Sequence, residues 1–60
     1  FEIIEEKKVE IEELSVNEAI MQMDLLEIPA YIFINEKTKK INLVRKRNDG
    51  KVSWIEIEKY

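Results

Sequence analysis

The chain has 60 residues and a formal net charge of −3 at pH 7, and it contains neither cysteine nor histidine. This composition excludes disulfides, thiolate nucleophiles, imidazole bases and the usual zinc ligands. A chain this short forms one domain at most, with a marginal core that a partner surface would stabilise. No apolar run approaches the roughly 18 residues of a membrane span, and Phe1 heads the chain without a signal-peptide pattern. We therefore expect residues 1–60 to be a single domain of a longer cytoplasmic protein that makes no membrane contact.

Charge is divided unevenly along the chain. Residues 1–29 hold nine acidic and two basic residues, whereas residues 30–60 hold four acidic and eight basic residues. We interpret both sets as solvated faces that partly offset each other in the fold, because a nucleic-acid patch needs stronger evidence than charge alone.

The N-terminal part is acidic, and we interpret residues 1–6 as the end of a linker. Residues 7–11 alternate between polar and apolar types, and this period of two predicts a strand. The alternative is a strand that starts as early as Ile3.

A helix follows. Ser15 and Glu18 have the S-x-x-E spacing of a capping box, which predicts that the helix begins at Val16. Pro29 cannot continue a helix, so the helix should end near Glu27. Apolar residues at steps of three and four predict one core stripe, formed by Val16, Ala19, Ile20, Met23 and Leu26. Met21 and Leu25 widen this stripe on one side.

Three strands complete the predicted fold. Residues 30–34 form a β-branched and aromatic run typical of a strand covered on both faces, and residues 41–47 and 52–57 form a hairpin. A two-residue hairpin loop would place Leu43 beside Glu56 and waste the apolar pattern. We therefore predict a three-residue loop, 48–50, with a left-handed glycine as a bulge. This loop sets the register by pairing Ile41 with Ile57, Leu43 with Ile55, and Val44 with Trp54.

The register assigns side chains to the two faces of the sheet. We expect Ile41, Leu43, Ile55 and Ile57 to pack on the helix, and Val44, Val52 and Trp54 to lie on the opposite face. The predicted fold is α+β, with a single helix on a small, mostly antiparallel sheet in the order β-α-β-β-β. The second apolar face needs a partner, and a C2 homodimer through the sheet covers it most simply. The predicted dimer-interface residues are Tyr31, Phe33, Val44, Val52 and Trp54. Of these, Tyr31 and Phe33 face either the core or the partner.

Other site chemistry is sparse. Arg45, Lys46 and Arg47 could contact the phosphates of a nucleic acid, but solvated edge charges that deter strand aggregation are the preferred interpretation. No histidine accompanies the carboxylates, and a lone glycine, Gly50, excludes a glycine-rich phosphate loop. We expect no enzymatic activity, no cofactor, no metal and no small-molecule substrate.

The order of motifs from Ser15 to Gly50 is similar to that of one family. The matching elements, in chain order, are Glu18-Ala19, Gln22-Met23, Leu25-Leu26, an aromatic strand, Asn35, Thr38, Val44, the basic pair Lys46-Arg47 and Asp49-Gly50. This pattern resembles the C-terminal domain of long-form ribosome hibernation-promoting factors, of the sigma-54 modulation protein/S30EA ribosomal protein family. The chain departs from that pattern at Glu13-Leu14, Glu27-Ile28, Arg45, Val52 and Trp54. The resemblance therefore implies a dimer that uses Trp54 where relatives use other hairpin aromatics.

The resemblance implies a function as well as a fold. The domain would be a non-enzymatic homodimerisation module, and an N-terminal domain of the same protein would bind the ribosome. Two inactive ribosomes would thereby be paired and translation silenced in dormancy. Two alternatives stay open, namely an RNA-binding module that uses the basic hairpin and an adaptor whose sheet face binds a different protein.

Overall fold

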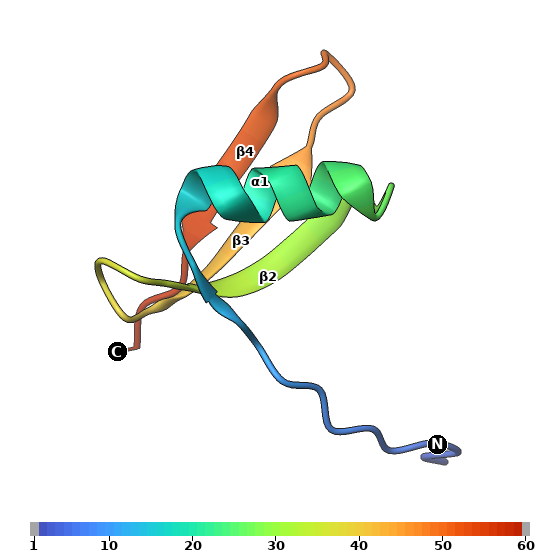
Figure 1. Cartoon of the computed structure of the whole chain (residues 1–60). Coiled ribbons are helices and arrows are strands. Elements are labelled where there is room, and N and C mark those ends of the chain that lie inside the picture. Colours follow the sequence, from blue (N-terminus) through green and yellow to red (C-terminus); the bar gives the residue numbers. More distant parts are fainter. Residues whose placement is uncertain (1, 60) are drawn as a thin grey trace.

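The computed structural model describes residues 2–59, in which one helix lies across a four-stranded sheet (Figure 1). The elements are β1 (Glu13–Leu14), α1 (Val16–Leu25), β2 (Ala30–Asn35), β3 (Ile41–Lys46) and β4 (Val52–Glu56). The strands lie side by side in the order β1-β2-β3-β4; β1 is parallel to β2, and the other neighbours are antiparallel. The predicted α+β class and the order β-α-β-β-β are confirmed.

Helix α1 begins where the capping box predicts. The Ser15 hydroxyl accepts the Glu18 amide at 3.1 Å, and the Glu18 carboxylate accepts the Ser15 amide at 3.1 Å. Both contacts satisfy amides that have no partner inside the helix. The helix ends at Leu25, slightly before the predicted end, because Glu27 already has the left-handed φ of 55°.

The β3–β4 hairpin has the predicted loop and register. The Arg47 amide donates to the Lys51 carbonyl at 2.8 Å across the three-residue loop 48–50, and Gly50 has a φ of 83°. Only glycine adopts that conformation without strain. The predicted pairs are confirmed, namely Ile41 with Ile57, Leu43 with Ile55, and Val44 with Trp54.

The core lies between α1 and the two central strands. Ala19 and Met23 of the helix are buried against Phe33 of β2 and Val44 of β3. Five half-buried apolar residues surround them: Leu14, Val16, Ile20, Ile28 and Tyr31. The predicted helix stripe is therefore only partly correct, because Leu26, Met21 and Leu25 are exposed.

The assignment of faces to the helix was wrong. Val44 is fully buried beneath α1, whereas Leu43 and Ile55 lie on the face that the helix leaves open. The physical reason is the connection between parallel neighbours, β1-α1-β2. Such crossovers are nearly always right-handed, which allows the helix to cover only one face of the sheet.

The first predicted strand was also wrong. Residues 7–11 are not in a strand, and β1 consists of Glu13–Leu14 alone, held by the Ile34 amide on the Glu12 carbonyl at 2.9 Å. The preceding residues 2–12, hereafter the N-terminal arm, run away from the domain without regular structure (Figure 1). The alternating residues of the arm therefore pair with none of the four strands in this structure.

Candidate interaction surfaces

One face of the sheet carries a continuous apolar surface that α1 does not cover. Ile32 lies opposite Leu43, and Leu43 lies opposite Ile55, so side chains of three neighbouring strands share this face. Ile32 and Ile55 are each 45% exposed. We call this surface the open face and define it by six residues: Ile32, Ile34, Ile41, Leu43, Ile55 and Ile57. Monomeric proteins rarely leave such a contiguous apolar patch to water.

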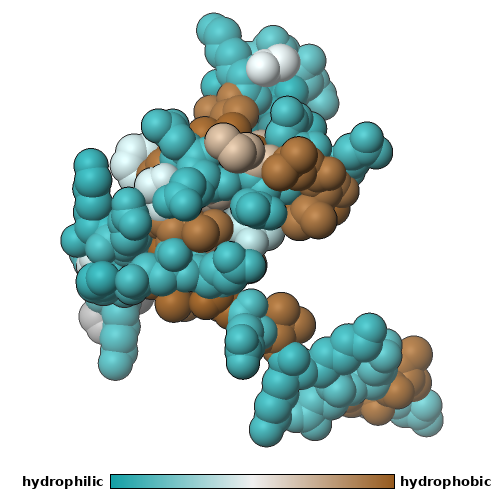
Figure 2. Space-filling view, in the orientation of Figure 1, coloured by the Kyte–Doolittle hydropathy of each residue, from teal (hydrophilic) through white to brown (hydrophobic). Residues whose placement is uncertain are grey.

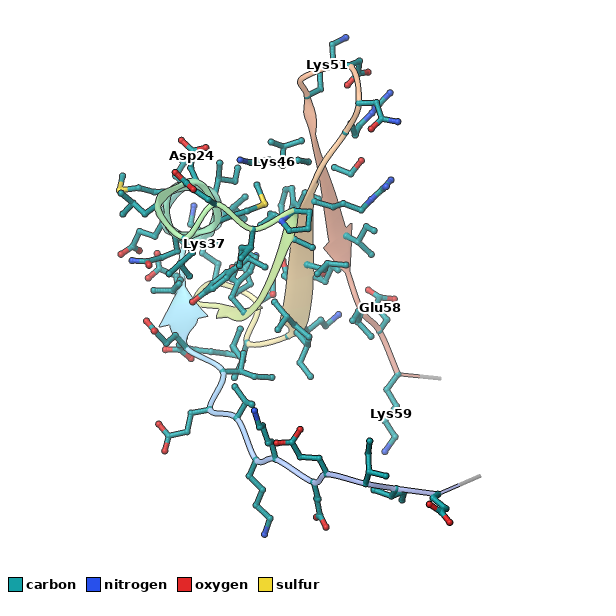
Figure 3. All side chains as sticks on the ribbon, turned by 90° about the vertical axis from the view of Figure 1, so that its right-hand side faces the viewer. Asp24, Lys37, Lys46, Lys51, Glu58 and Lys59 are labelled. Carbon is teal, nitrogen blue, oxygen red and sulfur yellow. The ribbon has the colours of Figure 1, made fainter. Side chains whose placement is uncertain are left out.

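The opposite side of the molecule looks different. Figure 2 shows the side that α1 covers, where hydrophilic and apolar groups are interspersed on the body of the domain and apolar groups appear again on the N-terminal arm. The exposed apolar residues of α1 and its C-terminal end include Met21, Leu25 and Leu26. In Figure 3 α1 lies on one side of the sheet, and the arm passes below the sheet toward the other side. The helix side therefore mixes polar and apolar groups, whereas the six residues of the open face are all apolar.

The five predicted interface residues lie on the helix side of the sheet. Phe33 and Val44 are fully buried in the core, and Tyr31 is half-buried against it. Val52 and Trp54 of β4 lie beyond the reach of α1 and remain 38% and 56% exposed. Phe33 and Val44 thus have no surface to offer a partner in this fold. The expectation that Val44, Val52 and Trp54 lie away from the helix is wrong.

A gap separates α1 from β4, because the helix packs on β2 and β3. Two open pockets lie along this gap. The pocket at the N-terminal end of α1 is lined by Ser15, Val16, Asn17, Asn35, Lys37 and Trp54. The pocket toward the C-terminal end is lined by Ile20, Met23, Asp24, Lys46, Arg47, Gly50 and Val52. The mixed polar and apolar lining makes this gap a weaker candidate for a dry interface than the open face.

A buried asparagine network ties the sheet together on the helix side. The side-chain oxygen of Asn42 accepts the Trp54 indole N–H at 2.6 Å and the Asn35 amide N–H at 3.1 Å. The Asn42 amide in turn donates to the Lys40 carbonyl at 3.1 Å and to the Glu56 carboxylate at 3.3 Å. Sequence reasoning missed this network. Its signal was available in the sequence, because an asparagine flanked by Ile41 and Leu43 is unusual in an apolar strand.

Glu56 is the charged end of that network. The Thr38 hydroxyl donates to its carboxylate at 2.6 Å, and the Asn42 amide adds the second hydrogen bond. These bonds, helped by the charge of Lys40 and opposed by partial desolvation, lower the pKa of Glu56 below its ordinary value of 4.5. The folded state therefore favours the ionised carboxylate.

We predict that Glu56→Gln makes the fold less sensitive to acid. A lowered folded-state pKa contributes stability above the unfolded pKa of 4.5, and this contribution disappears as the pH falls through the folded-state pKa. Glutamine still accepts hydrogen bonds but does not titrate in this range. Thermal unfolding from pH 7 to pH 3 should show a smaller loss of Tm for the variant. The control is Glu36→Gln, which removes the same charge from a turn, and equal acid sensitivity of both variants would contradict the prediction.

The basic residues of the hairpin do not form one patch. Lys46 points to α1 and pairs with Asp24 at 3.2 Å, and Arg47 pairs with Asp49 at 2.8 Å (Figure 3). Arg45 lies next to Val44 in the strand and so points to the other side of the sheet, the open face. The predicted nucleic-acid contact by Arg45, Lys46 and Arg47 stays a prediction, and the structure divides the three residues between two faces.

Other kinds of site are sparse. Within residues 2–59, no three carboxylates, histidines or cysteines are grouped as metal ligands would be. Among the same residues, α1 is too short and too polar to span a membrane.

Similar proteins point to one family. Residues 1–53 match the family described as Sigma 54 modulation/S30EA ribosomal protein C terminus. The ribosome hibernation promotion factor of Bradyrhizobium diazoefficiens is 35% identical over 54 residues, which cover 90% of this chain and 27% of that protein. The factors of Bacillus subtilis and Staphylococcus aureus are 36% and 34% identical over 55 residues, which cover 92% of this chain and 29% of each relative.

The length of the match agrees with the resemblance predicted from the sequence. The chain spans less than a third of the curated relatives that it matches, and the matched family is named for the C-terminal part. The match extends over α1, β2 and β3 and into β4. This chain therefore belongs to the Sigma 54 modulation/S30EA ribosomal protein C-terminus family.

Proposed function

We propose that this domain is a non-enzymatic homodimerisation module of a ribosome hibernation promotion factor that acts in the bacterial cytoplasm. The observation that carries the proposal is the open face, an apolar surface built from three strands of a domain whose core is small. Burial of that surface against a partner supplies stability that a 60-residue chain can otherwise hardly obtain.

A second copy is the partner that best fits this surface. The six residues of the open face are all apolar, and the charged residues on the same side of the sheet, Glu13 opposite Ile34 and Arg45 opposite Ser53, lie at its margins. The face therefore best matches an equally apolar surface, such as that of a second copy. Two copies related by a two-fold axis bury the same surface twice in one closed assembly. The sheets then pack face to face as in a sandwich, with α1 on the outside of each protomer.

The biological consequence follows from the rest of the protein. The relatives are about three times longer than this chain and are named ribosome hibernation promotion factors. We propose that the remaining part binds the ribosome and that dimerisation of this domain pairs two inactive ribosomes. The domain itself then needs no catalytic group, cofactor or small-molecule ligand.

The test uses the full-length parent protein and its ribosomes. Leu43→Lys places a charge in the middle of the open face, and Met21→Lys places the same charge on an exposed position of α1. We predict that the Leu43 variant still binds ribosomes but no longer pairs them in sucrose gradients, while the Met21 variant pairs them normally. Normal pairing by the Leu43 variant would contradict the proposed role of the open face.

A further inference from the structure

The N-terminal arm exposes apolar side chains that nothing in the described chain covers. Ile3, Ile4 and Val9 are 83%, 91% and 80% exposed. The arm leaves β1 and passes to the side of the sheet opposite α1 (Figure 3). An extended segment with this much exposed apolar surface is suited to pairing with another strand.

The free edge of β4 offers the complementary backbone. Within residues 2–59, β4 pairs with β3 alone, so its other edge is unpaired in the described part of the chain. The Ile57 amide donates a hydrogen bond to the Ile41 carbonyl at 2.9 Å. Because hydrogen-bonded and non-hydrogen-bonded residue pairs alternate along an antiparallel ladder, the amides and carbonyls of Val52, Trp54 and Glu56 point away from β3. A row of unpaired backbone groups is a template for an added strand.

The acidic groups of the N-terminal arm lie mainly on either side of residues 7–11, which themselves hold two lysines and one glutamate. The N-terminal arm holds five glutamates and two lysines. Beyond the loop, Lys51 precedes β4 and Lys59 follows it, and neither forms an ion pair within residues 2–59. Arg45 lies on the open face close to this edge, opposite Ser53 of β4. A strand added beside β4 would bring the flanking glutamates Glu5, Glu6 and Glu12 toward these basic groups.

We propose that, in the homodimer, each N-terminal arm adds as a fifth strand to the free edge of the partner's β4. This inference rests on the proposed homodimerisation and names the segment that completes it. The alternating residues 7–11 match the five-residue length of β4. Val9 and Ile11 share one face of the added strand and extend the open face beside Ile55.

A partner's edge is a better target for the arm than the edge of its own β4. The arm starts at β1, and β2 and β3 separate β1 from β4 in the sheet. To reach its own β4, an arm must cross the open face, which would cover the surface needed for dimerisation. If the two arms are exchanged, each open face stays free to contact the partner. A reciprocal exchange of this kind forms a closed dimer with two-fold symmetry.

Disulfide trapping distinguishes the two arrangements, because the natural chain has no cysteine. Ser53 lies between two outward-pointing residues of β4, so it occupies a non-hydrogen-bonded position toward an added strand, where side chains approach closely. We mix a Ser53→Cys chain with a chain that carries Val9→Cys or Ile11→Cys and oxidise the mixture. The expected product is a disulfide-linked heterodimer. Neither single variant alone should yield that product.

Two outcomes would overturn the proposal. If the double variant Val9→Cys/Ser53→Cys closes its disulfide within one chain, in preference to linking two chains, the arm folds back on its own sheet. A proline variant provides an independent measurement. With Val9 or Ile11 opposite Ser53 at a non-hydrogen-bonded position, the amide of Glu10 points toward β4, so Glu10→Pro removes a backbone donor from the added strand. We expect it to weaken dimerisation at least tenfold, whereas Glu2→Pro, outside the alternating segment, leaves dimerisation unchanged. Dimerisation that Glu10→Pro leaves unchanged would refute arm exchange while the homodimer stands, whereas a wild-type monomer would refute the homodimer itself.

Discussion

Leu43→Lys is expected to convert the isolated domain from a dimer to a monomer, weakening self-association by at least about a hundredfold, or about 2.7 kcal/mol. Leu43 lies between Ile32 of β2 and Ile55 of β4, in the middle of the open face. In a two-fold dimer the substitution occurs twice, and each lysine must either be buried without a partner or push the sheets apart. Either result removes most of the association free energy.

The fold should survive this substitution. Leu43 is not among the residues that form or surround the buried core, and its side chain points away from α1. The matched control is Met21→Lys, because Met21 is 61% exposed on the helix and lies on the other side of the sheet. Circular dichroism should be the same for both variants. A Leu43→Lys chain that remains dimeric at the wild-type concentrations would show that another surface mediates association.

Phe33→Ala is expected to unfold most of the domain at 25 °C. The Phe33 side chain is fully buried against Ala19, Met23 and Val44, so alanine leaves a cavity in a core that contains four buried apolar residues among residues 2–59. Truncation of a buried phenylalanine costs about 3–5 kcal/mol. Small domains have a total free energy of unfolding near the low end of about 5–15 kcal/mol. The loss therefore consumes most or all of the stability.

The measurement must separate folding from association, since dimerisation stabilises the folded state. We would measure urea unfolding in the monomeric Leu43→Lys background for Phe33→Ala and for its neighbour Ile32→Ala. Ile32 is 45% exposed on the open face, so its truncation should lower the free energy of unfolding by less than about 1.5 kcal/mol. Equal losses for the two variants would contradict the placement of α1 on the Phe33 side of the sheet.

Local features of this fold could be predicted from the sequence because they depend on neighbouring residues. Ser15 and Glu18 cap each other across one helical turn, and Gly50 supplies the left-handed residue that the hairpin loop needs. The loop length in turn fixed the register of β3 and β4. Each of these predictions used chemistry within a few residues of chain.

The side of the sheet on which α1 packs could not be predicted in the same way. Both faces of the hairpin are apolar in the sequence, so hydrophobic patterning favours neither Val44 nor Leu43 for the core. The decisive element is β1, which has two residues and pairs with a strand 21 positions later. Two residues have no measurable period, and a parallel contact at that separation leaves no local pattern.

The candidate site shows the same division. The sequence predicted an apolar surface in excess of what one helix can cover, and the structure contains such a surface. Val44, Val52 and Trp54 were assigned to it because their face was inverted, whereas the facing of Tyr31 and Phe33 stayed open. The Trp54 indole is instead turned toward Asn42, in a network whose partners come from different strands. Such a network becomes visible only when the strands are aligned.

The most direct test of the central proposal is the molar mass of the wild-type domain, measured by sedimentation equilibrium across micromolar concentrations. The account predicts a dimer of twice the 7.2 kDa chain mass, with the monomer gaining only on dilution. A mass of 7.2 kDa at every concentration would contradict homodimerisation of this domain and leave the open face for a different partner.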